Sequence, residues 1–296
     1  MKGLISGIKR LEIHDGDGLR TTVFFKGCPL RCIWCHNPET FSFKPEISFY
    51  QHKCIGCEAC VDECPTGALT KSGYNKEKCI LCAKCAEACP TDARILFGKE
   101  YEARTLAHEV LKDREFFENG GGGVTLSGGE CLMQIDFAVE LAKIFFEEGI
   151  SVDIDTCGYV PKKNLERIIP YVDVFLYDLK AIDNEVHIAC TGKDNSLILE
   201  NLRYLSESGC KIEIRYPLVM GYNDGECEKI AKFLTKMKGI TKVKVLKYHS
   251  FAASKYEALN IKNTLPDTVT TDEDIENAVS IFKSYGINAI NGAKED

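Results

Sequence analysis

Residues 21–35 have the sequence TTVFFKGCPLRCIWC. The first five residues are β-branched or aromatic and are soon followed by a glycine and a proline, which predicts a strand that ends at the first cysteine. Cys28, Cys32 and Cys35 have the spacing C-x3-C-x2-C, with no fourth cysteine in the loop. Three thiolates on a four-iron cluster leave one iron open to a further ligand, as catalytic metal sites do. The alternative is three cysteines that share no ligand.

Strand-like and helix-like segments alternate along the rest of the chain. We predict strands at residues 21–25, 124–126, 152–156, 174–179, 211–216 and 243–246, with a further short strand at 287–290. We predict helices at residues 106–117, 137–146, 165–169, 197–205, 230–237 and 275–285. This alternation builds βα units around a parallel sheet, so the predicted fold class is α/β. Right-handed crossovers allow a curled barrel or an open sheet, and periodicity does not choose between them.

Polar residues stand at the carboxyl ends of six predicted strands. In a parallel sheet these ends share one edge, and ligands bind there. The residues are Gly27 and Cys28, the turn Ser127-Gly128-Gly129-Glu130, Asp155 and Thr156, Asp178 and Lys180, Arg215, and His249. We therefore predict a single site that is assembled from six strand ends.

Cysteines are frequent and unevenly distributed. The chain has 296 residues and 16 cysteines, and eleven of these lie between Cys28 and Cys89. Disulfide scaffolds are short, secreted and cysteine-rich throughout, and we find neither a signal peptide nor a membrane span in the sequence. We therefore expect a cytoplasmic protein whose clustered thiols bind metal. The formal net charge of −7 offers no basic surface for nucleic acid or for an anionic membrane.

Eight of the clustered cysteines form an internal repeat. Residues 54–65 and 79–90 both have the pattern C-x2-C-x2-C-x3-C-P, offset by 25 residues. This pattern is typical of bacterial ferredoxins, in which the fourth cysteine of each run binds the other cluster. We assign one [4Fe–4S] cluster to Cys54, Cys57, Cys60 and Cys89, and a second to Cys79, Cys82, Cys85 and Cys64. Zinc is the alternative, although zinc sites use two cysteine pairs rather than two runs of four.

The remaining five cysteines follow no ligand pattern. We expect them to be ordinary small side chains, mostly buried. They are Cys131, Cys157, Cys190, Cys210 and Cys227.

Several motifs in order resemble one enzyme family. The cysteine motif has an aromatic residue, Trp34, before its last cysteine. It is followed by SGGE at 127–130, DTCG at 155–158, YDLK at 177–180 and YH at 248–249. These features resemble the radical S-adenosylmethionine (SAM) enzymes. The segment DGDGLRTTVFFKGCPLRC at 15–32 further resembles the activating enzymes of glycyl-radical enzymes, such as pyruvate formate-lyase activating enzyme.

The resemblance extends from about Ile5 to Ile290, and the insert resembles that of the larger subgroup of this family. Two positions depart from the family pattern. Asp17 stands where many members have proline, and Cys157 stands where some have asparagine. Neither is a predicted cluster ligand, although either could alter the contact with a partner.

The resemblance implies a fold and a reaction. The fold is a partial (β/α)6 barrel of TIM type formed by residues 1–49 and 96–296, with a ferredoxin-like domain of two [4Fe–4S] clusters inserted at 50–95. SAM binds the open iron of a third cluster, and its reductive cleavage gives a 5′-deoxyadenosyl radical. This radical takes a hydrogen atom from a glycine Cα of a partner glycyl-radical enzyme. The expected electron donor is a flavodoxin or a ferredoxin, and a monomer is expected.

The resemblance also implies which residues contact the cofactor. Cys28, Cys32 and Cys35, with Lys180 on the SAM carboxylate, form the catalytic group. The expected SAM-binding residues are Trp34, Cys35, His36, Gly128, Gly129, Glu130, Asp155, Thr156, Asp178, Leu179, Lys180, Arg215 and His249. The two glycines lack Cβ atoms and would let the backbone approach the methionyl ammonium group. The two aspartates would bind ribose hydroxyls or, as in some members, a monovalent cation.

Each of these assignments has a structural alternative: an ordinary glycine turn, charges at strand ends, or a histidine that caps a helix. Two other functions also remain open. One is a radical SAM enzyme that acts on a small molecule or on a different peptide. The other is a plain iron–sulfur electron carrier, which would leave the GGE turn and the charged strand ends unexplained. The auxiliary clusters would serve either electron relay or docking.

Overall fold

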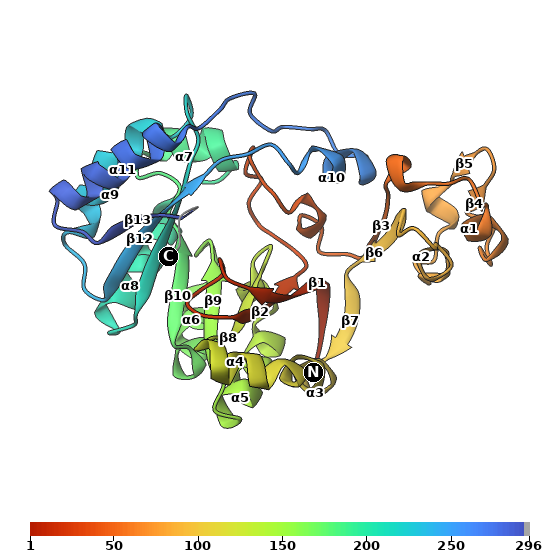
Figure 1. Ribbon diagram of the computed structural model, residues 1–296, viewed down its shortest axis with the longest axis horizontal. Helices are drawn as coiled ribbons and strands as arrows, with labels where there is room; N and C mark the ends of the chain where they lie inside the picture. Colours follow the sequence, from red (N-terminus) through yellow and green to blue (C-terminus); the bar gives the residue numbers. More distant parts are fainter. Residues whose placement is uncertain (293–296) are drawn as a thin grey trace.

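A nine-stranded sheet forms the centre of the computed structural model, which describes residues 1–292 (Figure 1). Its strand order is β13-β12-β11-β10-β9-β8-β2-β1-β7. The parallel strands are β2 (Arg20–Phe25), β8 (Gly123–Gly128), β9 (Ser151–Thr156), β10 (Val174–Asp178), β11 (Ile212–Leu218), β12 (Ile240–Lys247) and β13 (Ala289–Asn291). After β2, each of these strands pairs with the parallel strand that precedes it in this series, so the prediction of an α/β fold with a large parallel sheet is confirmed.

Two antiparallel strands extend the sheet beyond β2 and were not predicted. They are β1 (Lys2–Glu12), which pairs with β2, and β7 (Lys99–Glu102), which pairs with β1. Two glycines and several charges interrupt the apolar pattern of β1, and glycine weakens a strand signal. Gly3 has a packing reason, because a Cβ atom there would overlap with the ring of Phe137 on the neighbouring helix α5.

Helices connect the strands and lie mostly where the periodicity predicted them. They are α3 (Ala103–Val110), α4 (Arg114–Gly120), α5 (Ile135–Glu147), α6 (Lys162–Ile168), α7 (Asn184–Thr191), α8 (Ser196–Glu207), α9 (Cys227–Leu234), α10 (Ala253–Ala258) and α11 (Asp272–Ser284). The single helix predicted at 106–117 was wrong. A 3-10 turn at Leu111–Asp113 divides it, and Asp113 accepts hydrogen bonds from Arg10 and Thr21 there. Helices α7 and α10 were not predicted.

The two faces of the parallel sheet differ in chemistry. One face carries apolar side chains such as Val23, Leu126 and Ile154, which pack with helices α5, α8 and α11 into one core. The opposite face carries Arg20, Thr125, Asp153, Glu213 and Lys244, all nearly inaccessible to solvent. Strand residues alternate between faces, so a single register places every one of these polar side chains on the same side.

The polar face is covered by the segment between β1 and β2. Its Asp15 carbonyl accepts a hydrogen bond from Thr125 on β8 (2.5 Å), and its Asp17 carboxylate pairs with Lys242 on β12 (2.7 Å). The segment therefore bridges strands from the two halves of the sheet. Asp17, one of the two departures from the family pattern, makes one of these two contacts.

The residues between β3 (Glu46–Phe49) and β6 (Arg94–Phe97) form a smaller unit that projects from the sheet (Figure 1). The antiparallel pair of β3 and β6 joins this unit to the rest of the chain. The sequence repeat is also a structural repeat. Helix α1 (Ala59–Asp62) recurs as α2 (Lys84–Glu87), and the 3-10 turn Gln51–Lys53 recurs as Lys76–Lys78, each 25 residues later.

Backbone conformation follows the same repeat. The residues before the two short helices, Glu58 and Ala83, both have positive φ, at 60° and 67°. Gly67 and Asp92, which follow the fourth cysteines, share this conformation at 61° and 50°. A short hairpin of β4 (Leu69–Thr70) and β5 (Gly73–Tyr74) follows the first run.

No helix within residues 1–292 combines the length and the apolar character needed to cross a membrane.

The charged face of the sheet yields a prediction about stability. Arg20 and Asp153 form an ion pair (3.3 Å) whose side chains are almost fully buried. An Arg20→Met substitution leaves the Asp153 carboxylate without its partner, and we expect a loss of about 3–5 kcal/mol in unfolding free energy. The measurement is urea unfolding of the purified protein under anaerobic conditions.

Arg114→Met is the matched control, because Arg114 makes an exposed ion pair with Glu148. That pair should contribute at most about 1 kcal/mol. An Arg20→Met loss no larger than the control's would contradict the prediction.

Candidate functional site

The loop that follows β2 carries Cys28, Cys32 and Cys35. Cys32 is buried, whereas Cys28 and Cys35 are partly exposed. The loop packs in a small apolar cluster of its own, separate from the main core. Cys35 Sγ accepts a hydrogen bond from the backbone N–H of Asn37 (3.4 Å). Three sulfur atoms thus lie on one short loop at the carboxyl edge of the sheet.

Helix α7 holds this loop on one side through backbone contacts. The N–H groups of Arg31 and Ile33 donate to the carbonyls of Thr191 and Cys190, each at 2.9 Å. These contacts use only backbone atoms, so no side-chain motif in the sequence predicted them.

Helix α10 holds the end of the loop on the other side. The Tyr256 hydroxyl donates to the Cys35 carbonyl (3.1 Å), and Lys255 Nζ donates to the His36 carbonyl (2.9 Å) and to Glu39 Oε1 (2.6 Å). Sequence analysis missed both α10 residues, since the short helix has no clear apolar period.

The GGE turn after β8 packs directly against the cysteine loop. Gly128 has φ +114°, and a Cβ atom there would overlap with the backbone of Phe25. A Cβ atom on Gly129 would overlap with the carbonyl of Gly27 and stand 3.0 Å from Cys28 Cβ. The glycines therefore serve a close approach between two segments of this chain. An approach to the methionyl group stays a prediction.

Glu130 is buried and joins the ends of two strands. Its carboxylate accepts hydrogen bonds from the Thr156 hydroxyl (2.8 Å), from the N–H (2.9 Å) and thiol (3.0 Å) of Cys157, and from the Leu132 N–H (3.1 Å). Burial raises the pKa of Glu130, and these donors oppose the rise. These contacts support the turn and the end of β9, and SAM binding by Glu130 stays a prediction.

Cys157 is more than an ordinary buried side chain. Its thiol donates its single hydrogen to the Glu130 carboxylate, which also accepts a hydrogen bond from the Thr156 hydroxyl. The sequence signal was available, since Cys157 lies inside the DTCG motif and is one of the departures from the family pattern.

Arg215 contacts two carboxylates and one backbone carbonyl at the same edge of the sheet. Its guanidinium lies 3.3 Å from the carboxylates of Asp155 and Asp15 and donates to the His14 carbonyl (2.8 Å). Asp155 also accepts a hydrogen bond from the Ser127 hydroxyl (2.6 Å). Burial raises the pKa of Asp155 to about 7, although Arg215 opposes the rise. The sequence predicted Arg215 and Asp155 but assigned no role to His14 or Asp15.

Lys180 and Asp178 form a close pair that was not predicted, with Nζ 2.7 Å from Oδ2. Burial by itself would lower the pKa of Lys180, but the Asp178 carboxylate and Cys32 outweigh it, so the pKa is raised. Lys180 thus keeps its positive charge next to the cysteine loop. Leu179 is buried, and its N–H donates to the Arg215 carbonyl (3.0 Å).

The rings of His249 and His36 stack on each other next to the end of the cysteine loop. Their ring centroids are 4.0 Å apart and nearly parallel, and Phe251 stacks on His249 at 4.4 Å. Burial lowers the pKa of His36 to about 4, so this ring is neutral at pH 7. Phe251 is 83% exposed, which leaves an aromatic surface open to solvent. Trp34 is buried within the apolar cluster of the loop.

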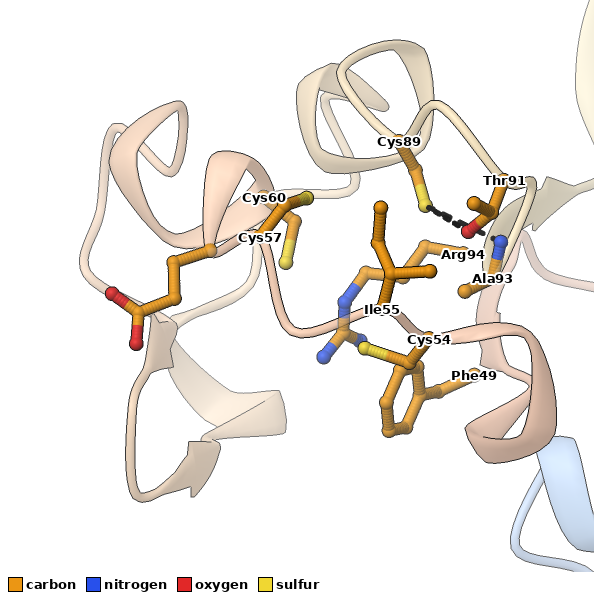
Figure 2. Close-up of a pocket in the computed structure, with 10 residues that line it drawn as sticks. Phe49, Cys54, Ile55, Cys57, Cys60, Cys89, Thr91, Ala93 and Arg94 are labelled. Atoms are coloured by element: carbon orange, nitrogen blue, oxygen red, sulfur yellow. Dashed lines mark hydrogen bonds between the residues drawn. The ribbon is translucent and has the colours of Figure 1, made fainter.

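The eight cysteines of the insert line two cavities of similar volume, about 310 and 340 Å³. Figure 2 shows the first cavity, where Cys89 of the second run faces three cysteines of the first run. The cysteines of the first cavity are Cys54, Cys57, Cys60 and Cys89, and those of the second are Cys64, Cys79, Cys82 and Cys85. In both cavities the fourth cysteine of one run therefore lies with the first three of the other.

Backbone N–H groups point at several of these sulfur atoms. Leu69 donates to Cys64 Sγ (3.4 Å) and Ala93 donates to Cys89 Sγ (3.3 Å). Within residues 1–292, no group of three or more His, Cys, Asp or Glu side chains could hold a single metal ion. The cysteines of the insert instead surround a volume.

Comparison with known proteins gives the family. Residues 22–234 match the Radical SAM superfamily. The chain belongs to the radical SAM superfamily. Its cysteine loop, GGE turn and charged strand ends all lie within the matched range, apart from His249.

Curated relatives place this radical SAM protein more narrowly. It is 43% identical to the trans-4-hydroxy-L-proline dehydratase activating enzyme of Clostridioides difficile, over 97% of this chain and 98% of the relative. It is 38% identical to the choline trimethylamine-lyase activating enzyme of Oleidesulfovibrio alaskensis, over 96% of each chain. The resemblance to activating enzymes of glycyl-radical enzymes is therefore confirmed, as is the prediction of an enzyme, a radical SAM activase.

Solved structures agree in fold. SuiB of Streptococcus suis, bound to its precursor peptide SuiA, aligns with 87% of this chain and 43% of its own, at a TM-score of 0.52 and 15% identity. A radical SAM methyltransferase of Sphaerobacter thermophilus aligns with 72% of this chain and 61% of its own, at a TM-score of 0.50 and 18% identity. Family membership implies a [4Fe–4S] cluster and SAM as cofactors.

The close packing of Gly129 against the cysteine loop can be tested. A Gly129→Ala substitution adds a methyl group where the Gly27 carbonyl and Cys28 already lie, so the loop must shift. We expect iron content after anaerobic reconstitution to fall by about the four irons of one cluster.

Gly225→Ala is the matched control, because a Cβ atom at Gly225 meets no atom within 4 Å. Its iron content should equal that of the unmodified chain. Equal iron content in both variants would show that the approach of Gly129 does not position the loop.

Proposed function

We propose that this protein activates a glycyl-radical enzyme. It cleaves SAM reductively at a [4Fe–4S] cluster held by Cys28, Cys32 and Cys35, and the resulting 5′-deoxyadenosyl radical removes a hydrogen atom from a glycine Cα of its partner. The observation that carries the proposal is the three-cysteine loop at the carboxyl edge of a parallel sheet, in a chain 43% identical over nearly its whole length to a curated activating enzyme.

The chemistry of the loop suits an open cluster. Three sulfur atoms on one loop leave the fourth iron for a substrate, and the loop is fixed from both sides by α7 and α10. A cluster held in this way supplies the electron that breaks the sulfonium bond of SAM. The protein's part is to orient SAM and to exclude water.

Residues around the loop supply complementary charges for SAM. Lys180 keeps its positive charge beside Cys32, which suits the SAM carboxylate. Asp155 and Asp178 are acidic groups at neighbouring strand ends, which suits ribose hydroxyls or a monovalent cation. His36 is neutral and stacked, so its flat ring suits an uncharged adenine. Gly128, Gly129, Glu130, Thr156, Leu179, Trp34, Arg215 and His249 complete the proposed set.

The insert, residues 50–95, is proposed to be a ferredoxin-like domain with two [4Fe–4S] clusters. The crossed grouping of cysteines in the two cavities supports the assignment, as do the N–H groups that point at sulfur. A zinc site would require ligands that converge on one point at about 2.3 Å. The cysteines here line cavities instead.

The proposed fold also gives a partner enzyme access to the site. We propose a partial (β/α)6 barrel of residues 1–49 and 96–296, whose open side admits a loop of the partner enzyme. The parallel strands from β2 to β13 lie side by side in the order in which they occur along the chain, and this supports the shape. A flavodoxin or ferredoxin is the proposed electron donor, and a cytoplasmic monomer is the proposed state.

The test starts from protein reconstituted anaerobically with iron and sulfide. After reduction in the presence of SAM, we expect 5′-deoxyadenosine by chromatography. With a candidate glycyl-radical enzyme added as the partner, we expect an organic radical by electron paramagnetic resonance (EPR). Absence of 5′-deoxyadenosine would refute SAM cleavage, and 5′-deoxyadenosine without a protein radical would favour a different substrate.

A pair of cysteine variants separates the reactive loop from other cysteines. Cys32→Ser should abolish 5′-deoxyadenosine formation and lower the iron content by about four of twelve atoms. Cys210→Ser is the control, because Cys210 belongs to no ligand pattern and lines neither cavity. It should keep both iron and turnover, and the reverse outcome would contradict the ligand assignment.

A further inference from the structure

At one pair of equivalent positions in the repeat of the insert, one residue is charged and the other is apolar. The sequence CPTDAR ends the second run at 89–94, and CPTGAL ends the first at 64–69. Arg94 is therefore the 25-residue counterpart of Leu69. Arg94 lines the first cavity and Leu69 lines the second, so equivalent positions face the two predicted clusters.

Arg94 is held at the first cavity without a carboxylate partner. It opens β6 opposite Phe49, and its guanidinium lies 4.3 Å above the centre of that ring. Its Nε is buried and has no hydrogen-bond partner. Among the described residues no carboxylate lies within 4.0 Å of it to form an ion pair. Figure 2 shows the side chain extending among the cysteines of this cavity.

No Lys, Arg, Asp or Glu lines the second cavity, whereas the first is lined by Arg94 and by Glu58, whose carboxylate is paired with Lys71. The lining of the second cavity consists of its four cysteines, seven apolar residues including Ile47 and Leu69, and the polar side chains Thr66 and Tyr74. Arg94 is absent from the lining of the second cavity, whereas it forms part of the lining of the first.

We propose that Arg94 makes the cluster at Cys54, Cys57, Cys60 and Cys89 the more easily reduced of the two auxiliary clusters. The inference rests on the proposed function, which places a cluster in each cavity. A four-thiolate cluster gains one negative charge when it accepts one electron, and a nearby fixed cation stabilises that state. No bond forms or breaks, and the electron comes from the external reductant.

The experiment measures the reduction potentials of the auxiliary clusters. The full chain carries Cys28→Ser, Cys32→Ser and Cys35→Ser, so that only the insert gives an EPR signal in a dithionite titration with mediator dyes. In this background we expect about eight irons and two distinct potentials. Arg94→Leu should lower the reduction potential of the first cluster, which is the higher one, and so narrow the difference between the two potentials. Leu69→Arg should raise the potential of the second cluster.

Arg94→Lys is the conservative variant, and it should retain most of the difference because it keeps the charge. The inference is wrong if Arg94→Leu keeps eight irons and changes neither reduction potential. It is also wrong if Arg94→Lys changes the reduction potentials as much as Arg94→Leu does. Should Arg94→Leu lose a cluster, the Leu69→Arg shift still decides. Fewer than about eight irons in the background chain would instead refute the two-cluster insert.

Discussion

Arg20, Asp153 and Glu213 lie in the middle of one sheet face and are almost completely buried. A buried charge is tolerated only when it is paired or hydrogen-bonded, so this face cannot simply be covered by an apolar helix. Helices pack on the opposite face, and the charged face is bridged by a polar segment that contributes Asp15 and Asp17. The position of the functional site follows, because the charged face continues to the carboxyl edge.

At that edge, pairs of neighbouring groups hold the cysteine loop in place. Gly129 allows the GGE turn to touch Cys28, and Glu130 ties the turn to the end of β9. Arg215 links β11 to Asp155 on β9 and to Asp15 before β2. Most of the polar side chains are satisfied within the chain, so the edge is organised before any cofactor binds. Such preorganisation reduces the ordering that binding requires.

The insert differs from the sheet in how little apolar core it has. It has little apolar core of its own: Tyr50, Ala68, Leu69 and Ala93 are the buried apolar residues within 50–95, and its two halves are copies with the same turns. Small units without a sufficient core usually need metal or disulfides for stability. The sixteen cysteines are thus divided among the three-cysteine loop, two cavities, and five others, of which Cys157 contacts Glu130 of the GGE turn.

The sequence by itself determined the parallel strands, the repeat of the insert, the family and the candidates at the strand ends, because periodicity and cysteine spacing are local properties. Only the tertiary structure decided that Gly129 packs on Cys28, that α7 and α10 clamp the loop, and that β1 and β7 extend the sheet. These contacts join residues distant in sequence, many through backbone atoms. Backbone hydrogen bonds carry no side-chain signature, and close packing depends on how elements meet in space.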